Sequence, residues 1–240
     1  MTDSQLIDYF QRARNDSSLA VIEGVQALKH AARFKAELLT VITCDISLLE
    51  TLLDELANDV KDSILQMTEL VKEAVFGRLS PQPPRTKVIA VAKRKHYALA
   101  DRDPSKPIVL LEDPRDLENI GAVIRVSAAA DAAAVCITGP SSIWHPAVIR
   151  GAAGLQYALP VLNVALEDIF KLNRQLVSLD PTGEEVTATQ QDTVLIFGTE
   201  RHGISKEVLA KSDQIVRLPM KEGVSSLNLA TSVAATLYRL

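Results

Sequence analysis

The stretch VRLPMKEGVSSLNLATSVA, residues 216–234, decides the fold class because it joins a short apolar run, a glycine-containing loop and a helical pattern. The run ends at Leu218, the loop contains Gly223, and apolar spacing predicts a helix from about Ser226. The earlier stretch LIFGTERHGI, residues 195–204, shows the same order of strand, glycine turn and helix. Strands that alternate with helices predict an α/β domain with a parallel sheet covered on both faces.

The same alternation fills the second half of the chain. Strands are predicted at 107–113, 134–138, 159–164, 175–179, 193–198 and 214–219, a DPTG turn at 180–183, and helices at 119–130, 146–151, 166–173 and 205–211. Eight of the 10 glycines lie in this half, several of them directly after strands. Ligands of open α/β sheets bind beyond the carboxyl ends of the strands, so we expect a ligand site here.

A smaller α/β domain is predicted in the first half. The pattern indicates strands at 19–24, 37–45, 64–67 and 87–94, with helices at 25–34, 46–57 and 68–77. Charged residues, proline and serine then replace apolar periodicity. The predicted organisation is therefore a small domain at 1–97, a linker at 98–106 and a larger domain at 107–240.

Composition excludes several classes of protein. The 240 residues are 47% hydrophobic and 23% charged, as in folded proteins, and the net charge of −4 argues against a nucleic-acid binder held by bulk positive charge. No apolar run approaches the roughly 20 residues of a membrane helix, and the polar start is unlike a signal peptide, so we expect a cytoplasmic protein without a membrane partner. The two cysteines and four histidines lack metal-ligand spacing, so no metal is expected.

Familiar nucleotide and hydrolase motifs are missing. No G-x-G-x-x-G follows the first strand of either half, and no G-x-S-x-G is present. GTERHG, residues 198–203, has the glycine spacing of a phosphate loop, but Ile204 and Ser205 follow it instead of Lys-Ser or Lys-Thr. Taken alone, this segment is equally consistent with an ordinary strand-to-helix turn.

Three segments change that interpretation together: DPRDLENIGAVIR (113–125), LIFGTERHGI (195–204) and VRLPMKEGVSSLNLATSVA (216–234). In order and spacing they resemble the three motifs of the TrmH/SpoU family of RNA ribose 2′-O-methyltransferases, members of the SPOUT superfamily. The resemblance covers 107–240, and IWHPAVIRGAAGLQYALPV (143–161) is similar to the family's stretch between its first two motifs. AVIEGVQALKHA (20–31) is similar to the opening of the small ribosomal-protein-like RNA-binding domain of many members.

The resemblance implies a SPOUT-type parallel sheet with a C-terminal trefoil knot, threaded between about 193 and 234. It also implies that S-adenosyl-L-methionine binds in a bent form to the knot loops. The implied cofactor residues are Gly198, Thr199, Leu218, Met220 and Leu227. Glycine allows close backbone approach, and Met220 would pack on the adenine ring. The alternative for Leu218 and Leu227 is that they are core residues.

The resemblance assigns the central catalytic role to Arg125, supported by Asn119, Glu200, Ser226 and Asn228. We interpret Arg125 as a clamp on the target phosphate that polarises the 2′-hydroxyl, because a guanidinium stays protonated and is a poor base. Glu200 would orient an arginine. Asn119 and Ser226 could instead cap the helices that they open. The residues 116–118 lengthen the expected loop before Asn119 relative to the shorter family form.

The first half is expected to meet the RNA. The acidity of the chain lies in 107–240, whereas 1–106 is balanced and the stretch 74–100 contains no Asp or Glu. The predicted RNA-binding residues lie within this stretch: Arg85, Lys87, Lys93, Arg94 and Lys95. The alternative is a solvated basic edge strand that deters aggregation.

The expected activity is methyl transfer from S-adenosyl-L-methionine to a ribose 2′-hydroxyl of rRNA or tRNA, by a homodimer whose interface includes the last helix. One alternative is an RNA-binding or assembly protein that keeps the fold without turnover. Another is an α/β protein that binds a nucleotide other than RNA.

Overall fold

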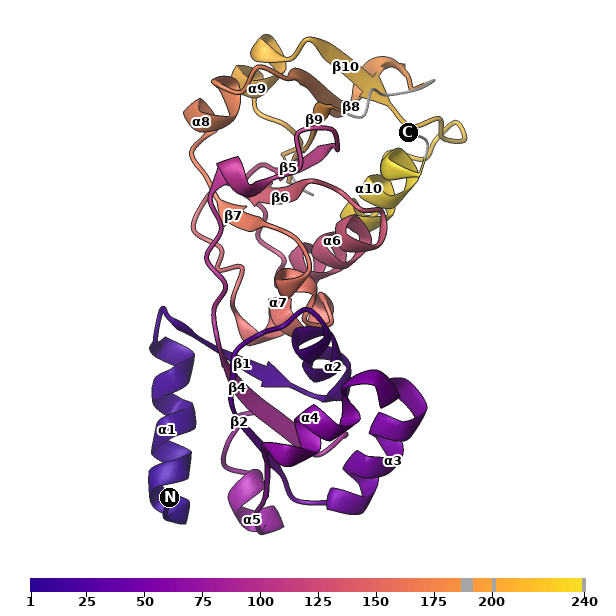
Figure 1. The fold of residues 1–240 in the computed structure, drawn as a ribbon. Coiled ribbons are helices and arrows are strands. Elements are labelled where there is room, and N and C mark those ends of the chain that lie inside the picture. The colour runs from indigo at the N-terminus through magenta and orange to yellow at the C-terminus, as the bar shows by residue number, and fades with distance from the viewer. Residues whose placement is uncertain (187–191, 200–201, 239–240) are drawn as a thin grey trace. The chain divides into compact units, whose positions relative to one another are not determined.

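The computed structural model describes residues 1–186, 192–199 and 202–238. The chain forms two compact units (Figure 1). The first contains Met1–His96 and Trp144–Ala158, and the second contains Tyr97–Ile143 and Leu159–Leu240.

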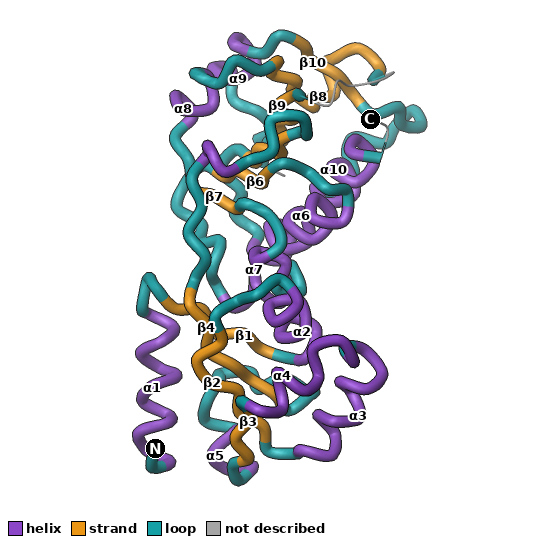
Figure 2. The backbone as a smooth tube through the Cα atoms, in the orientation of Figure 1, coloured by secondary structure: helices purple, strands orange, loops and turns teal. Residues whose placement is uncertain are grey.

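The first unit is built on a four-stranded sheet in the order β1-β4-β2-β3. Strand β4 is antiparallel to both β1 and β2, whereas β2 and β3 are parallel. The strands are β1 (Leu19–Glu23), β2 (Leu38–Thr43), β3 (Thr68–Leu70) and β4 (Val88–Lys93). The helices are α1 (Asp3–Asn15), α2 (Val25–Arg33), α3 (Ile46–Leu56), α4 (Lys61–Gln66) and α5 (Glu73–Phe76) (Figure 2).

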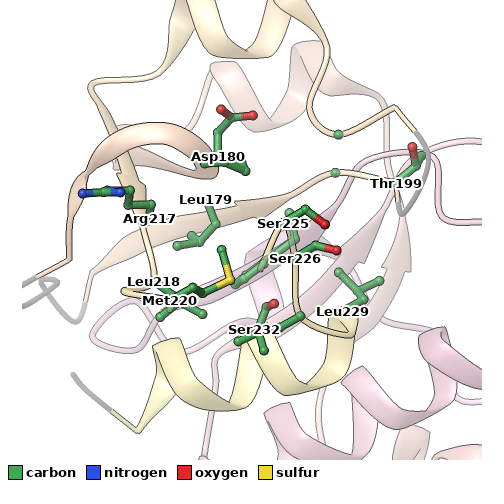
Figure 3. Close-up of a pocket in the computed structure, with 15 residues that line it drawn as sticks. Leu179, Asp180, Thr199, Arg217, Leu218, Met220, Ser225, Ser226, Leu229 and Ser232 are labelled. Atoms are coloured by element: carbon green, nitrogen blue, oxygen red, sulfur yellow. The ribbon is translucent and has the colours of Figure 1, made fainter. Parts of the chain in front are cut away.

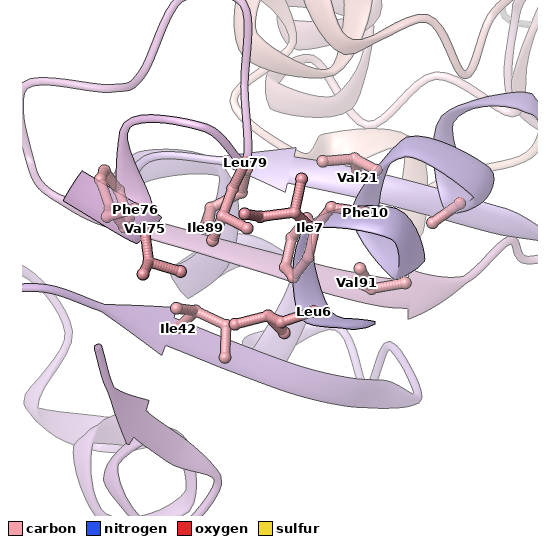
Figure 4. Packing of buried hydrophobic residues seen from close by; sticks show 11 residues of the cluster. Leu6, Ile7, Phe10, Val21, Ile42, Val75, Phe76, Leu79, Ile89 and Val91 are labelled. Carbon is pink, nitrogen blue, oxygen red and sulfur yellow. The ribbon is translucent and has the colours of Figure 1, made fainter. Parts of the chain in front are cut away.

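Helix α1 covers one face of this sheet, although no element was predicted before residue 17. A capping box begins it: the Thr2 side chain accepts from the Gln5 backbone N–H, and the Gln5 side chain accepts from that of Thr2. Leu6, Ile7 and Phe10 then pack with Ile42 of β2 and other buried side chains (Figure 4). The apolar face of the helix therefore completes the core of the unit.

Two predictions in the first unit are wrong. The stretch 64–67 was expected to be a strand, but it contains the end of α4, and 68–77 was expected to be a helix, but it begins with β3. A four-residue apolar run has too few periods to distinguish strand from helix. Ile64 is completely buried at the end of the helix, which explains the apolar signal.

The second unit confirms the predicted parallel α/β architecture. Its six strands lie in the order β10-β8-β9-β5-β6-β7, and every neighbouring pair is parallel. The strands are β5 (Ile108–Leu111), β6 (Ala134–Ile137), β7 (Val161–Asn163), β8 (Gln175–Glu185), β9 (Thr193–Phe197) and β10 (Gln214–Arg217). The helices are α6 (Leu117–Ala129), α8 (Leu166–Phe170), α9 (Lys206–Lys211) and α10 (Leu229–Leu237), and α6 packs against α10.

Strand β8 includes the predicted DPTG turn but leaves the ladder there. Val177 and Ser178 of β8 pair with residues 214 and 215 of β10. The pairing then resumes further along β8, where 184 and 185 pair with 216 and 217. Residues 179–183 therefore leave the regular register at the carboxyl edge of the sheet.

The segment Trp144–Ala158 belongs to the first unit, which differs from the predicted continuous domain at 107–240. It contains α7 (Pro146–Gly151), and its Tyr157 hydroxyl donates to the Lys93 carbonyl over 3.0 Å. Arg150 pairs with buried Glu23 at 3.0 Å, and Gly154 lies so close to α2 that a Cβ there would meet the Ala27 carbonyl oxygen at 2.3 Å. These tertiary contacts cannot be read from local sequence patterns.

Candidate functional site

A pocket of about 290 Å³ lies in the second unit, where β8, β9 and β10 reach their carboxyl ends (Figure 3). These three strands are neighbours in the sheet, so the residues that follow them meet at one edge. The lining includes all five residues predicted to bind the cofactor: Gly198, Thr199, Leu218, Met220 and Leu227.

The wall after β9 depends on the absence of a side chain at Gly198. A Cβ there would lie 2.1 Å from the carbonyl carbon of Gly203, far inside ordinary contact. Two backbone hydrogen bonds of 3.1 and 3.0 Å join Thr199 to Gly203, and the Thr199 hydroxyl accepts from the His202 N–H at 3.0 Å. The turn is thus held closed at the rim of the pocket.

The opposite wall is apolar and comes from the segment after β10 together with Leu179 of β8. Leu179, Leu218 and Met220 gather on one side of the pocket, with Thr199 on the other (Figure 3). Leu218 is half-buried and Leu227 is 41% exposed. The alternative that both leucines are core residues is therefore wrong.

Ser226 also lines the pocket, and it is not the cap of the helix that follows. The N-cap of α10 is Asn228, whose side-chain oxygen accepts from the Ala230 N–H at 2.9 Å and from the Thr231 N–H at 3.4 Å. The capping alternative is thus wrong for Ser226.

Asn119 is not a cap either. Asp116 caps α6 and accepts from the backbone N–H groups of Glu118 and Asn119 at 2.8 and 3.0 Å. The expectation of a longer loop before Asn119 is wrong for the same reason, because the added residues are a cap and the first helical turn. The Asn119 side-chain oxygen instead accepts from the Asn228 amide at 2.9 Å, which joins the starts of α6 and α10.

Arg125 lies on α6, and its side chain is exposed. Within the described part of the chain it has neither an ion-pair nor a hydrogen-bond partner. Its guanidinium is therefore available to a ligand. The expected partner Glu200 lies outside the described residues.

The predicted RNA-binding residues differ in their surroundings. Lys87 pairs with Asp45 and Glu73 at 3.5 and 3.6 Å, and Lys93 pairs with Glu37 at 2.7 Å. Glu37 and Asp45 precede the acid-free stretch 74–100 in the sequence, and Glu73 lies directly before it. The fold brings all three carboxylates next to lysines of that stretch.

Arg94 and Lys95 donate hydrogen bonds to backbone carbonyls. Arg94 is half-buried and donates to the Leu19 carbonyl at 2.5 Å, and burial lowers the pKa of its guanidinium from the usual high value. Arg85 is exposed, and exposed Lys95 donates to the Tyr157 carbonyl at 3.4 Å.

Sequence reasoning missed several pocket residues. Asp180 and Pro181 come from the excursion of β8, Arg217 from β10, and Ser232 from α10. The available signal was the DPTG segment itself, because a polar turn directly after a buried strand falls at the ligand-binding edge of a parallel sheet.

Two further observations bear on the kind of site. Over the described residues, no three His, Cys, Asp or Glu side chains form a group able to hold a metal ion. In that same part of the chain, no helix combines the length and apolar character needed to cross a membrane.

A parallel sheet with a pocket at its carboxyl edge, lined by a glycine turn and an apolar wall, is the arrangement of α/β proteins that bind a ligand beyond the ends of their strands. The chain belongs to the SpoU rRNA methylase family, whose model matches residues 106–238. The predicted TrmH/SpoU identity is confirmed.

Individual relatives agree with this assignment. The chain is 26% identical to a 23S rRNA (adenosine(1067)-2′-O)-methyltransferase of Streptomyces laurentii, over 98% of this chain and 90% of the relative. It is 35% identical to the 23S rRNA (guanosine-2′-O-)-methyltransferase RlmB of Pseudomonas syringae pv. tomato, over 58% and 60% of the two chains. The crystal structure of the SpoU methyltransferase AviRb from Streptomyces viridochromogenes in complex with AdoMet shares the fold, with a TM-score of 0.77, 21% identity and coverage of 100% and 96%.

Proposed function

We propose that this protein is an S-adenosyl-L-methionine-dependent enzyme that methylates a ribose 2′-hydroxyl of RNA. The observation that carries the proposal is one pocket lined by residues of the second and third family motifs. Its size is close to the lower end of ligand pockets, roughly 300 Å³, and it offers an apolar wall for an adenine ring beside polar groups. The residues present therefore fit this cofactor.

When bound, S-adenosyl-L-methionine supplies an activated methyl group, and the protein contributes position and charge. Met220 and Leu218 would hold the adenine, while the turn at Gly198 would admit close approach of the cofactor. Arg125 would bind a phosphate of the target nucleotide bidentately and polarise the 2′-hydroxyl as it loses its proton. Ser226 would contact the reacting groups from the pocket rim.

Asn228 acts in this scheme as a positioning residue. Its oxygen caps α10 and its amide donates to Asn119, so both ends of the side chain are engaged within the protein. The pair fixes the start of α6, the helix that carries Arg125, against the start of α10. We propose that Glu200 orients an arginine, as the family resemblance implies.

Ribosomal RNA is the substrate class that we propose first. A relative that matches 98% of this chain is named for a 2′-O-methylation of 23S rRNA. Arg85 and Lys95, two exposed basic residues, are proposed as the primary RNA contacts in the first unit. Lys87, Lys93 and Arg94 would contribute a weaker, local field because their charges are already engaged.

We also propose two features of the family for this chain: a trefoil knot between about 193 and 234, and a homodimer that includes the last helix. The return of the segment after β10 to the Gly198 turn, within one pocket, supports the knot. Tracing the chain in a crystal structure tests the knot, and light scattering coupled to gel filtration tests the dimer.

The test of the function is methyl transfer from labelled S-adenosyl-L-methionine to ribosomal RNA, followed by mapping of the 2′-O-methylated nucleotide. We expect Arg125→Ala to lower kcat by at least about 100-fold while leaving S-adenosylhomocysteine binding intact, because the arginine acts on the RNA. A protein that only assembles with RNA would bind RNA without labelling it. Unchanged transfer by Arg125→Ala would refute the mechanism.

A further inference from the structure

Asp180 occupies a central place at the pocket that the family motifs do not account for. It lies in the excursion of β8, the strand between β9 and β10 in the sheet. The two neighbouring strands lead to the Gly198 turn and to Leu218. The excursion at 179–183 therefore places a carboxylate between the glycine wall and the apolar wall of the same pocket.

The carboxylate of Asp180 is held in one orientation. Its Oδ1 accepts from the Thr182 backbone N–H at 2.9 Å and from the Thr182 hydroxyl at 2.6 Å. Its Oδ2 has no hydrogen-bond or ion-pair partner in the described part of the chain. That oxygen lies 3.9 Å from the point that a Cβ on Gly203 would occupy, so it faces the glycine turn. Figure 3 shows the carboxylate directed away from Leu218 and Met220.

Among the described lining residues, no cation is paired with this oxygen. Arg217 is the one basic residue among those described in the lining, and it pairs with Glu185 at 3.2 Å. An ionised carboxylate only accepts hydrogen bonds, so a ligand group that meets Oδ2 must be a donor. This half-buried acceptor can accept from water in the free protein and from a hydroxyl or ammonium group of a bound ligand.

We propose that Asp180 accepts hydrogen bonds from the ribose hydroxyls of the bound S-adenosyl-L-methionine, an inference that rests on the proposed function. The apolar side chains beyond Leu218 suit the adenine ring, which leaves the ribose on the side of the glycine turn. An acidic side chain beside a glycine turn at the carboxyl edge of a parallel sheet is also a general solution for binding the ribose of an adenine nucleotide.

The experiment compares two ligands by calorimetry: S-adenosylhomocysteine, and 5′-methylthioadenosine, which keeps the ribose but lacks the amino-acid group. Asp180→Ala is expected to weaken both ligands by a similar factor, roughly 10- to 100-fold. Asp180→Asn keeps an oxygen for the two Thr182 donors, so it preserves the turn and is expected to lose less affinity. Glu184→Ala removes an exposed charge from the same strand and is the matched control, with unchanged binding of both ligands.

The possible calorimetry results distinguish the ribose assignment from other roles of Asp180. Loss of S-adenosylhomocysteine binding alone would overturn the ribose assignment, since the carboxylate would then meet the amino-acid end. Unchanged binding of both ligands by folded Asp180→Ala and Asp180→Asn would overturn any contact with the cofactor. Failure of the wild-type protein to bind either ligand would instead refute the proposed function, and the ribose assignment with it.

Discussion

Replacing Gly198 by alanine tests whether the pocket depends on two backbones in contact. The new Cβ would lie 2.1 Å from the carbonyl carbon of Gly203 and 2.4 Å from the Ile204 nitrogen. Ordinary carbon contacts are about 3.5–4.0 Å, so the two segments must separate by more than about 1 Å. That shift breaks the paired hydrogen bonds between Thr199 and Gly203, now 3.1 and 3.0 Å.

The expected cost follows from these contacts. Two backbone hydrogen bonds contribute about 1 kcal/mol each, and overpacking adds about 1–3 kcal/mol, so Gly198→Ala should lower the free energy of unfolding by about 3–5 kcal/mol. Because the same turn lines the pocket, S-adenosylhomocysteine should bind at least about tenfold more weakly. Urea unfolding and calorimetry measure the two effects.

Gly77→Ala is the matched control. Its Cβ would meet only the Glu73 carbonyl oxygen at an ordinary 3.5 Å, so stability should change by less than about 0.5 kcal/mol and binding should not change. The reasoning is refuted if Gly198→Ala unfolds at the wild-type urea concentration and binds S-adenosylhomocysteine with wild-type affinity.

Three further predictions follow from single contacts. Asn228→Asp keeps the acceptor that caps α10 but cannot donate to Asn119, so kcat should fall while the thermal midpoint stays within a few degrees; a midpoint loss as large as that of Asn228→Ala would contradict this. Glu23 is 6% exposed and accepts from two arginines and a serine, so Glu23→Ala should cost about 3 kcal/mol in urea unfolding, and a neutral result would refute its role. Burial raises the pKa of the Cys136 thiol to about 12, so in the native protein iodoacetamide at pH 8 should modify Cys44 well before Cys136, as mass spectrometry would show. Because the unfolded thiol ionises at a lower pH than the folded one, this group should also reduce stability as pH rises above about 9.

The second unit was predictable because its strands are short and deeply buried. Runs such as Ile108–Leu111 and Thr193–Phe197 are buried throughout, so their apolar signal is continuous and bounded by turns. The five residues implied for the cofactor all line one pocket, and their role in binding it stays a prediction. Sequence motifs that follow different strands can predict such a pocket, because the carboxyl ends of parallel strands lie at the same edge of the sheet.

Other features could not be predicted because they depend on contacts distant in sequence. The acid-free stretch 74–100 indicated a field of unpaired positive charge, but Glu37, Asp45 and Glu73 neutralise Lys87 and Lys93 across the fold. Asp180 gave no periodic signal, since its role depends on where β8 leaves the ladder. The interpretation of Asn119 and Ser226 as helix caps is wrong by a few residues, because the caps of α6 and α10 are Asp116 and Asn228. Where several polar residues stand close together, the sequence does not show at which of them the helix begins.

The membership of Trp144–Ala158 in the first unit has a consequence for how such proteins are rearranged by recombination. The chain passes from one unit to the other three times, after His96, Ile143 and Ala158. A chimaera that exchanges only 1–96 with that of a relative would join a foreign sheet to the native Arg150 and Tyr157, whose partners lie on the removed piece. Domain shuffling in this architecture therefore requires that 1–96 and 144–158 be exchanged together, because these two segments must stay matched to each other.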